Sequence, residues 1–228
     1  MRKYRDLLFD ADNTLLDFSR SEHEAIGECF RSFGLPAGDR EIACYSAIND
    51  SYWKRLERGE VRKEDLYWMR FQTYLETQGL QGDAKEMNRR YKLRLAEKSY
   101  LWDGALEVCR TLYAHYRLYL ITNGDKYVQD HRFRPSPLFP LFKDCFISEE
   151  IGYEKPSAAY FDAVRQRIPD FSVSGALVIG DSLTSDILGG IRAGIDTCWF
   201  NPRNKPIPAD MQITYVIHDL RELIGILC

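Results

Sequence analysis

The sequence contains no apolar run of about 18 residues, the minimum for a membrane-spanning helix, so no membrane partner is expected. Among its 228 residues there are only 9 Pro and 15 Gly, which is ordinary globular usage and excludes a fibrous or low-complexity chain. Positively and negatively charged residues also nearly balance, with 31 Lys and Arg against 34 Asp and Glu. The net charge of −3 provides no general attraction to nucleic-acid polymers or anionic lipid.

Cysteine is sparse as well. The six cysteines are scattered without a Cys-x-x-Cys pair, and secreted disulfide scaffolds are shorter and much richer in this residue. Asp6, Asp10 and Asp12 interrupt the first apolar stretch, so no signal peptide is expected there. These features predict reduced thiols in a cytoplasmic protein.

The apolar residues fall in short runs that each end in polar or glycine residues: 7–9, 118–121, 145–147, 176–179 and 198–200. Runs of this kind are typical of strands buried on both faces, as in a parallel sheet. Helical periodicity follows in the segments 106–116, 158–168 and 183–193. The alternation predicts an α/β protein with a doubly wound, Rossmann-like parallel sheet.

The first two predicted strands are separated by far more than one helix. Helical periodicity extends over residues 19–98, with breaks near 34–36, 59 and 79–82, so about four helices fit there. We therefore expect a core formed by residues 1–18 and 99–228, with a helical domain of residues 19–98 inserted after the first strand. In open α/β folds, ligands bind outside the carboxyl ends of the strands, where such an insert would lie.

Four polar clusters lie at the ends of the predicted strands or just before a predicted helix. Taken singly, each has an ordinary explanation as a turn, a helix cap or a surface lysine. Proline favours the first helical position, which predicts a lysine immediately before a helix N-terminus. The clusters are Asp10 with Asp12, Thr122-Asn123-Gly124, Lys155-Pro156, and Asp181 with Asp186.

Together the clusters indicate chemistry. The carboxyl ends of parallel strands meet at one edge of a sheet, so carboxylates, small donors and a lysine should converge there. Oxygen ligands of this kind suit Mg²⁺, and an adjacent ammonium suits a phosphate group. Phosphoryl transfer needs an in-line nucleophile, neutralisation of charge and a proton for the leaving group, all of which this set could provide.

The order of these motifs resembles the haloacid dehalogenase superfamily, and the position of the insert resembles that superfamily's C1-type cap. Finer details resemble its pyrimidine 5′-nucleotidase branch. The residues that carry this finer resemblance lie in the insert, in the first motif and in the segments after the second strand. They are Asn13, Asn49 to Trp53, Gly59, Arg70-Phe71, Thr122-Asn123-Gly124, Gln129, Arg132, Phe139 to Phe142, Ser148-Glu149 and Gly152. Asn13 stands where the superfamily usually has Gly, and Asn tolerates the positive φ expected in that turn.

The resemblance implies specific roles. Asp10 would be the nucleophile that forms an aspartyl phosphate, and Asp12 would be the general acid and then the base. Mg²⁺ would be held by Asp10, the backbone carbonyl of Asp12 and Asp181. Asp186 would either orient the metal's waters or help hold Lys155. The phosphoryl group would be bound by Thr122, Asn123 and Lys155.

The expected activity is Mg²⁺-dependent hydrolysis of a small phosphate monoester, with a pyrimidine nucleoside 5′-monophosphate as the favoured substrate. Alternatives are a phosphomutase, a sugar-phosphate or phosphoglycolate phosphatase, and, least favoured, a catalytically silent binding module. A dehalogenase is disfavoured because that branch lacks the second aspartate of the first motif, here Asp12. The oligomeric state is not specified by the sequence.

One predicted helix of the insert has a face of mostly aromatic and apolar residues. Tyr45, Asn49, Tyr52, Trp53 and Leu56 recur at helical spacing, which for most of them indicates packing inside the insert. Asn49 is the exception, because a buried amide requires hydrogen-bond partners. We therefore predict that Asn49 and Trp53 recognise a nucleobase, Asn49 by hydrogen bonds to its edge and Trp53 by stacking.

Overall fold

The computed structural model describes residues 3–228 and divides the chain into two compact units. The first unit holds the chain up to Asp17 together with Tyr100–Cys228, and the second holds Phe18–Ser99. Phe18 and Ser99, which were expected in the core, lie in the helical unit.

The first unit is built on a parallel six-stranded sheet with the order β3-β2-β1-β4-β5-β6. The prediction of a doubly wound α/β fold is confirmed. The strands are β1 (Asp6–Asp10), β2 (Arg117–Thr122), β3 (Phe142–Ile147), β4 (Ala176–Gly180), β5 (Asp196–Phe200) and β6 (Tyr215–Ile217).

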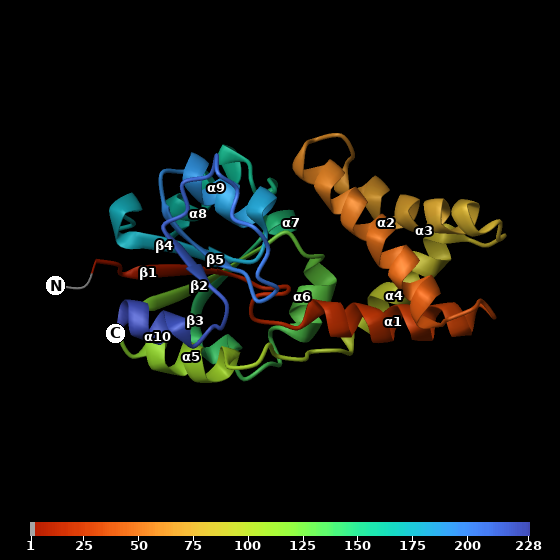
Figure 1. Cartoon of the computed structure of the whole chain (residues 1–228), viewed down its shortest axis with the longest axis horizontal. Helices are drawn as coiled ribbons and strands as arrows, with labels where there is room; N and C mark the ends of the chain where they lie inside the picture. The colour runs from red at the N-terminus through yellow and green to blue at the C-terminus, as the bar shows by residue number, and fades with distance from the viewer. Residues whose placement is uncertain (1–2) are drawn as a thin grey trace. The chain divides into compact units, whose positions relative to one another are not determined.

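Alternate side chains of the central strand β1 enter two separate apolar layers. Leu7 and Phe9 pack with α5 (Ala105–Tyr113) and α10 (Glu222–Leu227), whereas Leu8 packs with α8 (Ala158–Arg167). Every position of this strand is therefore buried. This explains the continuous apolar runs in the sequence. Figure 1 shows α5 and α10 on one side of the sheet, and α8 and α9 (Leu188–Arg192) on the other. The helices of this unit are α5 (Ala105–Tyr113), α6 (Lys126–Arg132), α7 (Ser148–Ile151), α8 (Ala158–Arg167), α9 (Leu188–Arg192) and α10 (Glu222–Leu227), with 3₁₀ turns η1 (Phe139–Leu141) and η2 (Val173–Gly175).

Two elements depart from the sequence-based expectation. The segment predicted as one helix over 183–193 begins as a π-helical stretch, η3 (Leu183–Ile187), and continues as α9. Strand β6 was not foreseen, because it is short, lies at the sheet edge and is only partly buried.

The second unit consists of the four helices expected for the insert: α1 (Phe18–Ser32), α2 (Asp39–Glu57), α3 (Lys63–Gln78) and α4 (Ala84–Ala96). Local signals set their ends. Gly79 adopts φ +64° and terminates α3, and the Asp83 side chain accepts hydrogen bonds from the first turn of α4. Aromatic rings fill the centre, where Phe30 stacks on Tyr74 at 4.5 Å between ring centroids.

Among the described residues, no helix is long and apolar enough to cross a membrane.

Close packing of α9 on the sheet provides a stability prediction. A Cβ on Gly190 would lie 2.6 Å from a Thr197 methyl group and 3.3 Å from Val178. We expect Gly190→Ala to lower the free energy of unfolding by about 1–3 kcal/mol through overpacking, measured by urea denaturation. The control is Gly225→Ala in α10, where a Cβ would meet nothing within 4 Å and should leave stability unchanged or raise it slightly. Equal effects at both positions would contradict the packing argument.

Candidate active site

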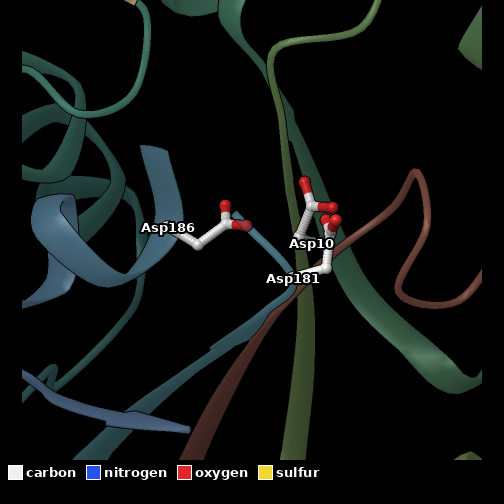
Figure 2. A group of neighbouring side chains, drawn as sticks. All are labelled: Asp10, Asp181 and Asp186. Atoms are coloured by element: carbon white, nitrogen blue, oxygen red, sulfur yellow. The ribbon is translucent and has the colours of Figure 1, made fainter. Parts of the chain in front are cut away.

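The candidate site lies at the carboxyl edge of the parallel sheet. Asp10 is the last residue of β1, Thr122 is the last residue of β2, and Asp181 follows β4 directly. The register pairs Asp10 with Ile121, so these strands end at the same level. Figure 2 shows Asp186 pointing from η3 toward Asp10 and Asp181. The sheet thus brings together residues far apart in the sequence.

Lys155 is the cation of this site and is almost fully buried. Its Nζ donates hydrogen bonds to Asp10 Oδ1 at 2.7 Å, Asp186 Oδ1 at 2.6 Å and the Ile121 carbonyl at 3.0 Å. Burial acts to lower the pKa of Lys155, but the charges of Asp10 and Asp186 outweigh it and raise this pKa above its usual value. The ammonium therefore stays charged.

The expectation that Lys155 directly precedes a helix was wrong. Helix α8 begins at Ala158 with Ser157 as its N-cap, and the Lys155–Pro156 peptide bond is cis. Pro156 is therefore not the first helical residue. The carboxylates that contact the ammonium, rather than a helix N-terminus, fix the position of Lys155.

Three carboxylates concentrate negative charge in the site. Asp10, Asp181 and Asp186 each offer one oxygen, and these atoms lie within 4.8 Å of one another. Burial and the charge of Asp186 raise the pKa of Asp10 to about 7, although Lys155 opposes the shift. Burial and the charge of Asp10 raise the pKa of Asp181 well above its usual value. One ammonium does not compensate three carboxylates, so the donor set fits a hard divalent cation.

Asp186 uses both carboxylate oxygens within the protein. Oδ1 accepts from Lys155, and Oδ2 accepts from the Ser182 backbone N–H at 3.1 Å. Of the two roles expected for Asp186, holding Lys155 is the one for which the structure shows a direct contact. Thr14 Oγ1 similarly lies 3.3 Å from the second oxygen of Asp10 and donates to it.

The Asp12 carboxylate is directed to a different group of residues. Its Oδ2 accepts from Gln129 Nε2 at 2.6 Å, and its Oδ1 accepts from Arg132 at 2.6 Å. The next residue, Asn13, has φ +60°, as the sequence predicted for this turn. The sequence resemblance includes Gln129 and Arg132 but implies no role for them. Their spacing of three residues on a helix directly after a polar strand end was the available signal.

Thr122 and Asn123 are both bonded within the protein. Thr122 Oγ1 accepts from the Gly124 backbone N–H at 2.9 Å and from Gln129 Nε2 at 3.2 Å. The Asn123 amide forms two hydrogen bonds with the Lys155 backbone, donating to its carbonyl at 2.8 Å and accepting from its N–H at 2.9 Å. Asn123 thus fixes the loop that carries Lys155, and its binding of phosphate stays a prediction.

The two residues predicted to recognise a base lie in the helical unit. Asn49 is buried, and its amide donates to Glu22 at 2.8 Å and accepts from Arg70 at 2.7 Å. The partners that a buried amide requires are therefore present within the helical unit itself. Trp53 is partly buried beside the apolar cluster that contains Leu66. Recognition of a base by Asn49 and Trp53 stays a prediction.

The site and fold agree with known proteins. A model of the haloacid dehalogenase-like hydrolase family matches residues 5–194, most of the chain. The chain therefore belongs to this family of enzymes, and the resemblance inferred from the motifs is confirmed. This chain is 41% identical to the putative HAD-hydrolase YfnB of Bacillus subtilis over 227 residues, which cover 100% of this chain and 97% of YfnB.

Two further relatives have names that state an activity. The pyrimidine 5′-nucleotidase PynA of Streptococcus pneumoniae is 36% identical, with 98% of this chain and 95% of PynA covered. The pyrimidine 5′-nucleotidase YjjG of Escherichia coli is 29% identical, with 99% of each chain covered. A crystal structure of YfnB bound to magnesium superposes with a TM-score of 0.94 and covers 99% of each chain.

The buried Glu22 in the helical unit provides a pH prediction. Burial raises its pKa to about 7 from an ordinary value of 4.5, so the folded protein binds this proton more tightly than the unfolded chain. The contribution of Glu22 to the free energy of unfolding should therefore be fully present below pH 4.5 and be lost as the pH rises through about 7. The expected loss is about 3 kcal/mol.

Urea denaturation at pH 5 and pH 8 measures this effect. Glu22→Gln should remove this contribution to the pH dependence, whereas Glu76→Gln, at an exposed position of the same unit, should leave it unchanged. An identical pH dependence in wild type and Glu22→Gln would show that Glu22 does not cause this loss of stability.

Proposed function

We propose that this chain is a Mg²⁺-dependent phosphatase that acts through an aspartyl phosphate on Asp10. The observation that carries the proposal is the position of Asp10, whose carboxylate is fixed by Lys155 and Thr14 at the sheet edge beside Asp181 and Asp186. An oriented carboxylate next to a charged ammonium can attack a phosphate monoester without large rearrangement.

In the first step, an oxygen of Asp10 forms a bond to phosphorus while the ester bond breaks and its electron pair goes to the leaving oxygen. Asp12 would donate a proton to that oxygen, then take one from the water that hydrolyses the aspartyl phosphate. Lys155 and Thr122 would stabilise the transferring group. Asp10, the Asp12 carbonyl and Asp181 would hold Mg²⁺, which neutralises phosphate charge when bound, and Asp186 would hold Lys155 beside this cation.

The proposed substrate class is pyrimidine nucleoside 5′-monophosphates. The names of PynA and YjjG support it, since both relatives match nearly the whole chain. The residues that resemble the pyrimidine 5′-nucleotidase branch support it as well. The helical unit, proposed as a C1-type cap, would then contribute base recognition through Trp53 and Asn49.

A phosphate-release screen over pyrimidine and purine nucleotides, sugar phosphates and phosphoglycolate tests this function. We expect the highest kcat/KM for a pyrimidine 5′-monophosphate, complete loss of activity in EDTA and recovery with added Mg²⁺. A hexose phosphate that is isomerised without phosphate release would identify a phosphomutase and overturn the proposal. Full activity in EDTA would overturn the metal assignment.

Asp10→Asn tests the nucleophile. The amide keeps the size of the side chain but removes the charge needed for attack and for holding a cation. We expect kcat to fall below about one hundredth of wild type, a barrier increase of more than about 2.7 kcal/mol. The exposed Asp103→Asn in the same unit serves as control and should retain full activity. A folded Asp10→Asn protein above that threshold would contradict the assignment.

Trp53→Ala tests base recognition. Stacking of a base on an aromatic ring is worth about 1–3 kcal/mol, so kcat/KM for a pyrimidine 5′-monophosphate should fall about 5- to 150-fold. Activity on a small aryl phosphate should change little. Trp68→Ala in α3 of the same unit is the matched control. An equal loss on both substrates in a folded Trp53→Ala protein would show that Trp53 serves packing alone.

A further inference from the structure

Two buried side chains on α6 hold the Asp12 carboxylate. Gln129 and Arg132 are 2% and 0% exposed, and each donates one hydrogen bond to a different oxygen of Asp12 at 2.6 Å. They stand three residues apart and therefore on one face of this short helix. We call Gln129 and Arg132 the Asp12 clamp.

The loop before α6 is shaped to admit this clamp. A Cβ on Gly124 would lie 2.2 Å from Gln129 Nε2, so a larger residue there would displace the amide. The same Nε2 also donates to Thr122 Oγ1 at 3.2 Å. The end of β2, the loop and the clamp thus form one hydrogen-bonded unit that extends to Asp12.

Stability alone is a weak explanation for this arrangement. Removing a guanidinium from water is costly, and a buried ion pair often contributes no more to stability than apolar side chains of similar volume would. Arg132 is fully buried, while the Asp12 side chain to which it is paired is 24% exposed. The pair therefore fixes the orientation of a carboxylate that remains accessible.

We propose that Gln129 and Arg132 are positioning residues that orient Asp12 for proton transfer to the leaving oxygen. This proposal rests on the phosphatase function proposed above. Two hydrogen bonds, one to each carboxylate oxygen, fix both side-chain torsions of Asp12.

The test compares two substrates that differ in their need for a proton. A nucleoside 5′-monophosphate has a poor alkoxide leaving group, whereas p-nitrophenyl phosphate releases p-nitrophenolate, which departs readily without protonation. The value of kcat/KM reports the steps through phosphoenzyme formation and excludes its later hydrolysis. The ratio of kcat/KM for the nucleotide to that for the aryl ester therefore isolates acid catalysis.

The variants are Arg132→Lys, which keeps the charge but loses the fixed guanidinium geometry, and Gln129→Met, which removes the amide donor. Asp12→Asn is the reference for loss of the acid. Arg117→Lys is the matched control, because Arg117 donates to the buried Asp6 at the opposite end of the strands. Thermal unfolding monitors whether each variant is folded.

Acid catalysis is typically worth about 100- to 10,000-fold, so we expect the substrate ratio to fall about tenfold or more in Arg132→Lys and Gln129→Met. It should stay at the wild-type value in Arg117→Lys. In the Asp12→Asn background, Arg132→Lys should cause no further loss on the nucleotide. If Arg132→Lys does not fold, the substrate ratio of Gln129→Met alone tests the proposal.

Two results would overturn the proposal separately from the function it rests on. Equal losses on both substrates in a folded clamp variant would make the clamp purely structural, as would losses that add in full to that of Asp12→Asn. A wild-type protein that releases phosphate from neither substrate would overturn the phosphatase function and the clamp's role together.

Discussion

The candidate site depends on one buried cation, the Lys155 ammonium, which forms ion pairs with the carboxylates of Asp10 and Asp186. Without the ammonium, burial and mutual repulsion would drive these acids toward protonation, and Asp10 would lose the charge that a nucleophile needs. Lys155 in turn depends on Asn123, which bonds to its backbone from the end of β2. Removing the Lys155 ammonium would leave the buried carboxylates of Asp10 and Asp186 uncompensated, at a cost of about 3–5 kcal/mol.

Buried polar networks also shape the second unit. Arg70 contacts Asn49 and Asn88 and lies 5.0 Å from the Tyr91 ring centroid, while Asn49 connects it to Glu22. An apolar four-helix core would have no need of these groups. The network fixes how α1, α2, α3 and α4 pack, because each polar side chain must meet its own partner.

The sequence predicted the sheet well because strands buried on both faces leave continuous apolar runs, and those runs locate the strand ends where Asp10, Thr122 and Asp181 lie. Side-chain direction beyond a strand end was harder to predict. The hydrogen bonds between Asp12 and α6, and between Asn123 and the Lys155 backbone, depend on the geometry of turns. The spacing of residues in the sequence does not encode that geometry. Asn49 was correctly identified as a buried amide in need of partners, but those partners come from α1 and α3, whose packing one sequence cannot specify.

The central claim is that Asp10 becomes phosphorylated during turnover. The most direct measurement is to mix the wild-type protein with Mg²⁺ and p-nitrophenyl phosphate, quench in acid within the first turnovers, and map phosphate on peptides by mass spectrometry. The account predicts an acid-stable, hydroxylamine-sensitive phosphate on the peptide that contains Asp10. An enzyme that releases phosphate steadily while phosphate appears on another residue, or on none in rapid-quench samples spanning the first turnover, would contradict it.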